Sequence, residues 1–329
     1  MMEMTLKNPM EEENISVVTE FIILGFPEFP EQQIPLFLLF LLIYLVILMG
    51  NLIIITVTCL DPHLHTPMYF FLGNLSFLDI SYTSVTLPKL MDILLKKSQR
   101  VSLFVCFTQM HFFVSLAFTE FLILGVMSYD RYVAICHPLH YAVLMDKRLC
   151  MLMATGTWII GFLVPLTYTI LISRFFYCRS NKLNHFFCDL PALLKLSCSS
   201  TYTIKSIMYI MVVFVGFPCF ITTLMSYIYI ISAILKIRST EGRCKAFSTC
   251  SSHLTVVILF YGTAVVSYMR PTSSKSDEQN KFIAVLYNVL IPIFNPMIHS
   301  LKNQEVKKAL RKICTTKLCS DQKNISLLN

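Results

Sequence analysis

Three consecutive polar residues, Asp130, Arg131 and Tyr132, follow a long apolar stretch in the segment MSYDRYVAIC (127–136). A carboxylate beside a guanidinium could serve an enzyme, and it could equally form a simple salt bridge. It could also act as a latch where a membrane helix reaches water. These residues alone leave the three alternatives open, so the rest of the sequence must decide among them.

Two further acids, Asp79 and Glu120, lie within otherwise apolar runs. Ionisable residues in membrane spans are rare and usually face the interior of a helix bundle. Each acid could accept hydrogen bonds from neighbouring polar side chains and so hold helices together. The two could instead share a bound cation, such as sodium, or a proton.

Motifs for catalysis or metal binding are absent from the sequence. It contains no His-Glu-x-x-His, phosphate-binding loop or Gly-x-Ser-x-Gly motif. His63 and His65 share a short loop, where scattered His pairs are usually structural or solvated. No cluster of His, Cys and acidic residues could bind a metal or activate a nucleophile, so we expect neither an enzyme nor a metal site.

The composition indicates a membrane protein. Of the 329 residues, 55% are hydrophobic and only 14% are charged, and the mean hydropathy is +0.65. A soluble domain usually carries about 25% charged residues. The net charge of +8 could suggest a nucleic-acid partner, but the basic residues form short clusters between apolar runs. We therefore expect a lipid bilayer around this chain and no nucleic acid.

Seven apolar runs are long enough to cross roughly 30 Å of hydrocarbon, which takes about 20 residues. Backbone groups in lipid must form hydrogen bonds within their own segment, so the runs should be helices. The odd number argues against the two equal halves of many transporters. The predicted runs are 34–58, 68–91, 103–129, 149–172, 203–235, 246–269 and 282–301.

The orientation rests on the N-terminal region and the cysteines, because Lys and Arg divide almost evenly between the two sides. Residues 1–33 contain seven acids and one Lys, show no cleavable signal peptide, and include a glycosylation sequon at Asn14. We therefore expect the N-terminus outside. This orientation places four of the twelve cysteines in or beside outer segments, where an even number suggests disulfides, with three connectivities open. They are Cys106, Cys178, Cys188 and Cys198.

Five motifs occur in order: LHTPMYFFLGNLSFLD (64–79), MSYDRYVAIC (127–136), SY (226–227), KAFSTCSSH (245–253) and NPMIHSLKN (295–303). Together they resemble the olfactory receptors, a branch of the rhodopsin-like G-protein-coupled receptors, from Gly50 to Asn303. The resemblance implies an all-α integral membrane protein of the plasma membrane, with seven spans and a short amphipathic eighth helix. It implies an odorant receptor that activates a stimulatory G protein and so raises cyclic AMP.

The resemblance also assigns roles to residues at the inner end and in the core. Asp130 would pair with Arg131 at rest, and activation would free Arg131 toward the G protein. Cys106 would pair with Cys188, and Cys178 with Cys198. Asn51, Asp79 and Asn295 would form a polar network. The remaining coupling and switch residues would be Tyr132, Tyr227, Lys245, Asn295, Pro296 and His299, the last standing where the family usually has Tyr.

The resemblance places a ligand pocket in the outer half of the third, fifth, sixth and seventh spans. Its lining would be apolar, with three hydrogen-bonding groups and no carboxylate, which suits a small, mostly uncharged, apolar ligand. For each residue, ordinary packing between helices is the alternative. The predicted lining residues are Phe113, Val114, Ala117, Phe118, Met211, Val215, Tyr261, Ala264, Tyr268 and Asn288.

The chain therefore divides into an outer tail (1–33), a receptor domain (34–301) and a cytoplasmic helix and tail (302–329). Residues 303–314 read as an amphipathic helix on the inner leaflet, ending at Cys314, which is either palmitoylated or reduced. Two other functions stay open: a receptor for a non-odorant small molecule outside the nose, and a membrane transporter. A transporter needs a continuous polar path, which Asp79 and Glu120 alone do not make.

Overall fold

The computed structural model describes residues 18–25, 33–96, 99–178, 180–268, 276–301 and 305–312, and most of them are helical. Each of the seven apolar runs forms a long helix, although residue 269 of the sixth lies outside the described residues. The long helices are α1 (Gln33–Leu60), α2 (Pro67–Lys96), α3 (Leu103–Cys136), α5 (Lys147–Ser173), α8 (Phe217–Leu235), α9 (Thr240–Tyr268) and α10 (Ser276–Leu301).

Shorter elements join these helices or extend them. A π-helical segment, η3 (Val212–Gly216), connects α7 (Tyr202–Met211) to α8, so that the three form one continuous span-length helix. The other short helices are η2 (Pro62–Leu64), α4 (Tyr141–Leu144), α6 (Leu190–Leu196) and a helix without a label at residues 305–312.

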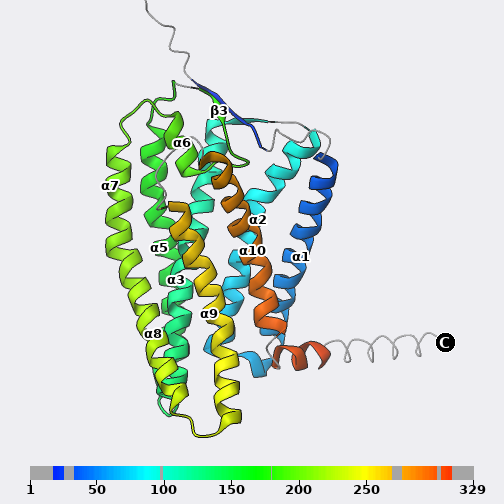
Figure 1. Cartoon of the computed structure of the whole chain (residues 1–329), viewed down its shortest axis with the longest axis vertical. Helices are drawn as coiled ribbons and strands as arrows, with labels where there is room; N and C mark the ends of the chain where they lie inside the picture. The colour runs from blue at the N-terminus through cyan, green and yellow to red at the C-terminus, as the bar shows by residue number, and fades with distance from the viewer. Residues whose placement is uncertain are drawn as a thin grey trace, which may run out of the picture.

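The long helices run side by side in one bundle (Figure 1). Helix α3 has the central place, because it contacts α2, α5, α8 and α9. Gly161 of α5 allows one of the closest approaches: a Cβ atom at this position would lie 3.1 Å from the Cα of Thr119 in α3. The central helix can therefore position side chains from several neighbours.

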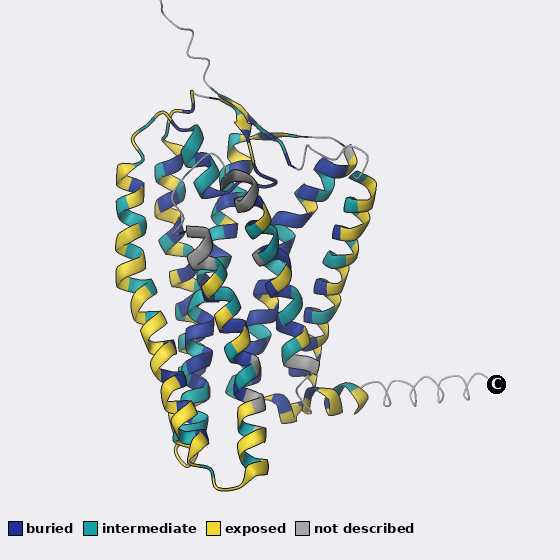
Figure 2. Ribbon diagram, viewed as in Figure 1, coloured by how far each residue is buried: buried dark blue, intermediate teal, exposed yellow. Residues whose placement is uncertain are grey.

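Five helices in the described part of the chain are long and apolar enough to cross a bilayer. They are Gln33–Leu60, Leu103–Cys136, Lys147–Ser173, Tyr202–Leu235 and Lys281–Ile298. Helices α2 and α9 lie in the same bundle but are not apolar over the same length; the apolar part of α9 is the shorter stretch His253–Thr263. The outer faces of α1, α7 and α8 are lined with exposed apolar side chains (Figure 2). Such continuous apolar surface suits contact with lipid rather than water.

One end of the bundle is covered by a structure that we call the roof, residues 18–25, 99–102, 176–178 and 180–200. Its centre is a three-stranded sheet in the order β2-β1-β3, formed by β1 (Glu20–Ile23), β2 (Arg100–Ser102) and β3 (Lys182–Leu183). Strand β1 pairs antiparallel with β2 and parallel with β3. Phe21 and Ile23 of β1 are fully buried. Part of the region expected to be a polar tail is thus built into the fold, because alternate apolar residues of a strand face one side.

Candidate functional site

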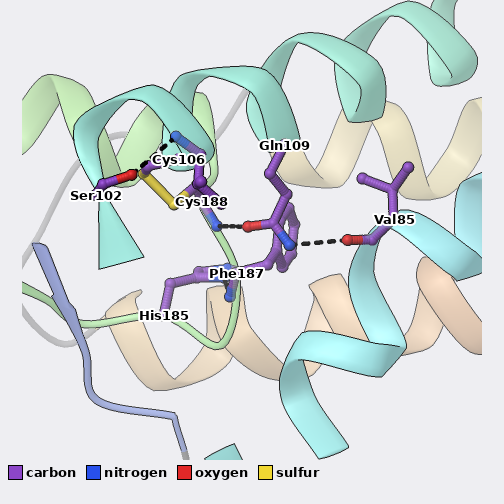
Figure 3. Close-up of a disulfide and its surroundings, with 8 residues drawn as sticks. Val85, Ser102, Cys106, Gln109, His185, Phe187 and Cys188 are labelled. Carbon is purple, nitrogen blue, oxygen red and sulfur yellow. Dashed lines mark hydrogen bonds between the residues drawn. A yellow bond between two sulfur atoms is a disulfide. The ribbon is translucent and has the colours of Figure 1, made fainter. Parts of the chain in front are cut away.

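Two disulfides hold the roof. Cys106 at the start of α3 is bonded to Cys188, with an S–S distance of 2.04 Å (Figure 3). Cys178 is bonded to Cys198. The structure therefore contains the pairing that the resemblance implies, out of the three that the sequence allows. The first bond attaches the roof directly to the central helix of the bundle.

Gln109, one turn beyond Cys106, joins the roof to a second helix. Its Oε1 accepts a hydrogen bond of 3.0 Å from the backbone N–H of Cys188, and its Nε2 donates one of 2.8 Å to the carbonyl of Val85 in α2 (Figure 3). Sequence reasoning missed this residue. A polar residue one turn from a predicted disulfide cysteine was the signal that could have found it.

An aromatic stack lies directly beneath the roof. Phe187, next to the disulfide, contacts Phe113 of α3 with ring centroids 4.5 Å apart, and Phe113 stacks on Tyr82 of α2 at 4.8 Å. Phe113 and Phe187 are fully buried. Phe113 was a predicted pocket residue, whereas Phe187 and Tyr82 were missed because their neighbours in space are distant in sequence.

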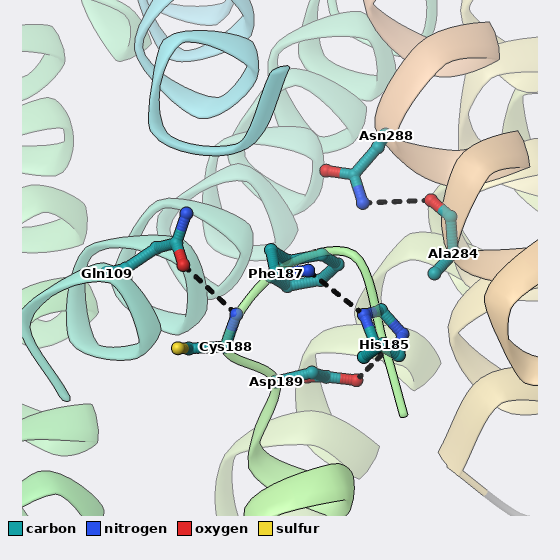
Figure 4. A network of polar contacts seen from close by, with 7 residues as sticks. All are labelled: Gln109, His185, Phe187, Cys188, Asp189, Ala284 and Asn288. Carbon is teal, nitrogen blue, oxygen red and sulfur yellow. Dashed lines mark hydrogen bonds and ion pairs between the residues drawn. The ribbon is translucent and has the colours of Figure 1, made fainter. Parts of the chain in front are cut away.

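Two titratable residues are buried in the roof beside this stack. The Nε2 of His185 lies 4.0 Å from the Oδ2 of Asp189, and the N–H of Phe187 donates to the Nδ1 of His185 (Figure 4). Burial, and then the charge of nearby Lys281, lowers the pKa of His185 to about 3. Burial raises the pKa of Asp189 to about 7. The folded roof therefore favours the uncharged form of both groups.

The other predicted pocket residues lie at several depths in the bundle. Val114, Ala117, Phe118, Met211 and Val215 are half-buried, and Asn288 is fully buried. The Nδ2 of Asn288 donates to the carbonyl of Ala284 (Figure 4). Its Oδ1 accepts from Thr86 of α2 at 3.4 Å. The side chains of Ala264 and Tyr268 lie outside the described residues.

Tyr261 is buried deeper in the bundle, between α3 and α8. Its ring contacts Phe121 with centroids 4.8 Å apart, and its hydroxyl lies 3.6 Å from the Sγ of Cys219. It belongs to a second aromatic group, separate from the stack under the roof. Among the predicted lining residues, the structure thus places Phe113 in the upper group and Tyr261 in the lower one.

A polar core lies midway along the helices. The Nδ2 of Asn295 donates to both carboxylate oxygens of Asp79, each at 3.0 Å, and Glu120 interacts electrostatically with Asp79. Within the described part of the chain, three buried oxygens in this region have no hydrogen-bond partner: Asn51 Oδ1, Glu120 Oε1 and Asn295 Oδ1. These three oxygens are acceptors that a bound cation or a proton donor would satisfy.

Asn51 has a second contact that explains its place opposite Pro296. Proline has no N–H, so Pro296 leaves the carbonyl four residues earlier, that of Pro292, without its helical donor. The Nδ2 of Asn51 in α1 donates to this carbonyl at 3.3 Å. Asn51 and Pro296 therefore act together in joining α1 to α10.

At the other end of the bundle, Asp130 has a partner that the resemblance did not imply. The Oδ1 of buried Asp130 accepts a hydrogen bond of 2.8 Å from the hydroxyl of Tyr141 in α4, and no Asp130–Arg131 ion pair forms among the described residues. Adjacent residues on a helix point in different directions, so their side chains do not face each other. Tyr141, from the loop after α3, takes the place expected for Arg131.

Two tyrosines of the predicted switch have histidine partners here. The hydroxyl of Tyr132 lies 3.1 Å from the Nε2 of His137, and buried Tyr227 is hydrogen-bonded to the Nδ1 of His253 in α9. His253 ends one of the quoted motifs, but sequence reasoning gave it no role. The side chains of Lys245 and His299 lie outside the described residues, as do Asn14 and Cys314.

The helix at residues 305–312, the described part of the segment 303–314, is amphipathic. Val306 and Ala309 are buried, whereas Lys307, Lys308 and Arg311 are exposed. It turns away from the end of α10 toward the side of the bundle (Figure 1). One face is thus packed and the other is basic.

Comparisons with known proteins agree on one family. A family sequence model described as "Olfactory receptor" matches residues 40–317. Mouse (Mus musculus) olfactory receptor 5AR1 is 47% identical over 304 residues, which are 92% of this chain and 98% of the relative. Its human (Homo sapiens) counterpart is 45% identical over the same shares. Rat (Rattus norvegicus) olfactory receptor 226 is 46% identical over 93% of this chain and 94% of the relative.

Proposed function

Because this chain belongs to the olfactory receptor family, whose members are membrane receptors and not enzymes, we propose that it binds a small, mostly apolar odorant and activates a stimulatory G protein, which raises cyclic AMP. The observation that carries the ligand class is the stack of Tyr82, Phe113 and Phe187 beneath the roof. This stack is apolar and fully buried at its centre.

An apolar ligand would gain binding free energy by leaving water, about 25 cal/mol per Å² of apolar surface buried. A few hydrogen-bonding groups would fix its orientation. Asn288 is suited to this role, because its amide lies at the level of Thr86 and the aromatic stack, and Tyr268 is the second candidate from the sequence. The ligand would thus be selected mainly by size and shape.

The protein is a multi-pass protein of the plasma membrane, and we propose that seven helices span it with the N-terminus outside. Helices α2 and α9 would be the two spans with lower hydropathy. Buried Asp79 in α2 and buried His253 in α9 face the bundle interior, which keeps these polar groups away from lipid. The helix at residues 305–312 would lie on the inner leaflet, and Asn14 would be glycosylated outside.

The polar core suits a sodium ion. Hard cations prefer oxygen ligands, and Asp79, Glu120, Asn295 and Asn51 offer carboxylate and amide oxygens, three of them without a partner among the described residues. A bound ion would supply positive charge between the two acids. The four side chains would hold the ion and connect α1, α2, α3 and α10.

Signalling would pass through Arg131 at the inner end of α3. Its neighbour Asp130 is already held by Tyr141, and Tyr227 and His253 join α8 to α9 close by. Movement of α9 away from α3 would separate this joint and expose Arg131 to a G protein. Lys245 and His299 would contribute at the same end, and Asn295 and Pro296 would act from the polar core, as the family resemblance implies.

A cyclic-AMP assay tests this function. Cells expressing the receptor and an olfactory-type stimulatory G protein are exposed to a panel of small apolar odorants, with untransfected cells as the control. We expect at least one odorant to raise cyclic AMP only in receptor-expressing cells. Silence across the panel at verified surface expression, or a response that persists without the stimulatory G protein, would contradict the proposal.

A further inference from the structure

Residues 18–25 of the roof form a segment that we call the N-terminal strap. Its strand is bonded along its whole length to the rest of the roof. Beyond the strand pairing, Ile22 N–H donates to Asn181 O at 2.7 Å, and Leu24 N–H donates to Leu183 O at 3.0 Å. Phe21 packs edge-on against Tyr177, with ring centroids 5.1 Å apart. The strap is therefore an integral part of the roof.

The strap ends at Gly25, whose backbone requires glycine. Its φ angle is +66°, a left-handed conformation that other residues adopt at a cost, and a Cβ atom there would lie 3.2 Å from Ile93 of α2. This conformation lets Gly25 N–H donate to the carbonyl of His185 at 3.0 Å. The end of the strap is thus bonded to the roof segment that carries Phe187.

Lys281, near the start of α10, fixes the same glycine from the bundle side. It is only 4% exposed, and its Nζ donates to the carbonyl of Gly25 at 3.2 Å. A charged donor on a buried carbonyl forms one of the stronger hydrogen bonds in proteins. Lys281 also lies close enough to His185 to disfavour its charged form.

These contacts form an unbroken chain from α10 to α3. Lys281 holds Gly25, Gly25 holds the His185 backbone, and the His185 ring accepts from Phe187 N–H at 3.4 Å. The ring of Phe187 then rests on Phe113. Figure 4 shows the His185–Phe187 part of this chain of contacts, with Phe187 between His185 and Gln109 of α3.

We propose that Lys281 and the strap are positioning elements for odorant recognition, which set where Phe187 sits above Phe113 and so limit the size of ligand that fits. This inference rests on the proposed receptor function. Without the Lys281 ammonium, the buried Gly25 carbonyl has lost a donor, and the strap and the Phe187 segment become freer to move. A looser roof discriminates less between short and long ligands.

Hydrogen exchange of the purified full-length receptor tests the positioning without any ligand. We expect Lys281→Met to speed exchange at the backbone N–H groups of residues 22–25 and 187–188 by about tenfold, because losing a hydrogen bond to a charged group typically changes an equilibrium by at least that factor. Lys281→Arg retains a charged donor and should restore protection. Lys205→Met, an exposed lysine at the same end of the bundle, is the matched control.

The second readout is ligand size preference, measured with straight-chain primary alcohols and their acetate esters of increasing length. At matched surface levels, Lys281→Met should reduce the discrimination between short and long ligands. The ratio of their half-maximal concentrations should move about tenfold closer to one. If Lys281→Met fails to reach the surface, Gly25→Ala serves as the second variant. It should shift both readouts in the same direction.

The outcomes separate this inference from the receptor function itself. Unchanged exchange in both Lys281→Met and Gly25→Ala would overturn the positioning role, and so would an equal loss of potency for all ligand lengths. A wild-type receptor that no probe activates would contradict the proposed ligand class, while the exchange data would still decide whether Lys281 holds the strap and Phe187.

Discussion

At the residue scale, Asp79 and Glu120 place two carboxyl groups in one buried polar region, with Asn295 bonded to the first. Like charges in a medium of low dielectric repel each other strongly, so a bound cation or a shared proton relieves them. The buried Oε1 of Glu120 has no hydrogen-bond partner, so it is the oxygen where such a cation or proton would bind.

We therefore predict that Glu120→Gln removes the dependence of thermal stability and basal cyclic AMP on sodium concentration. The amide keeps the shape of the side chain but loses its charge. The measurement is the thermal stability of the purified receptor, together with basal cyclic AMP in cells, over a range of sodium concentrations. Potassium replaces sodium in the control series. A wild-type receptor that shows no sodium dependence would leave the two acids with a structural role only.

His185 and Asp189 in the roof respond to pH in opposite directions. His185, with its pKa lowered from 6.5 to about 3, stabilises the closed roof above pH 6.5, and this contribution is lost as the pH falls toward 3. Asp189, with its pKa raised from 3.8 to about 7, contributes most below pH 3.8 and loses this as the pH rises to 7. Between pH 3.8 and 6.5 the two changes offset each other.

The prediction is a stability that is nearly flat with pH in the wild type and sloped in each single variant. Asp189→Asn should become less stable as the pH falls below 6.5, and His185→Gln should become more stable as the pH falls below 7. Each slope is at most about 1.4 kcal/mol per pH unit. Melting temperatures of purified receptor across this range provide the measurement, and slopes of equal sign would contradict the pairing.

At the element scale, the close contact of α3 with α5 depends on one glycine. A Cβ atom at Gly161 would lie 2.9 Å from the Cβ of Thr119, a distance that real Cβ contacts avoid, so the two helices would have to move apart. Gly156 lies in the same helix, and nothing approaches its Cβ position within 4 Å. The two positions therefore separate packing from helix propensity.

We predict that Gly161→Ala destabilises the receptor by about 1–3 kcal/mol, as overpacking of a close interface typically does. Gly156→Ala should be neutral, or should stabilise α5 by up to about 1 kcal/mol because alanine favours helix. Thermal unfolding in detergent and surface expression would be compared for the two variants. Similar behaviour of both would show that α3 and α5 have room to adjust.

At the scale of the whole molecule, recognition and coupling lie at opposite ends of the bundle and share α3. Phe113 and Cys106 lie near the roof, Glu120 lies in the middle, and Asp130 and Arg131 lie near the other end. A helix packed against four others can pass a change at one end to those packed neighbours. The Tyr227–His253 bond between α8 and α9 is the contact beside Arg131 that such a change would reach.

Arg131→Ala should abolish the cyclic-AMP response while the receptor still reaches the surface. The fold should be largely intact, because Asp130 keeps its hydrogen bond to Tyr141 rather than to Arg131. Arg148→Ala, an exposed arginine near the start of α5, is the matched control and should signal normally. A normal response from Arg131→Ala at wild-type surface levels would remove Arg131 from the coupling mechanism.

The sequence by itself determined the helices and the order of the motifs. Length and hydropathy of a run are local properties, so the seven runs could be located, and the long helices of the structure coincide with them closely. The resemblance to the family implied the two disulfides and the Asp79–Asn295 contact, although the cysteines alone left three pairings open. Among the predicted pocket residues, only a few, such as Phe113 and Asn288, have defined contacts in the structure.

Only the tertiary structure decided which distant residues meet. It made Tyr141 the partner of Asp130, assigned Asn51 to the carbonyl freed by Pro296, and placed Phe187 on Phe113. It also built part of the acidic N-terminal region into a sheet and bonded Gly25 to Lys281, residues 256 positions apart. Such contacts depend on how helices rotate and cross in the bundle. Those rotations follow from the packing of all side chains together, which no local pattern in the chain records.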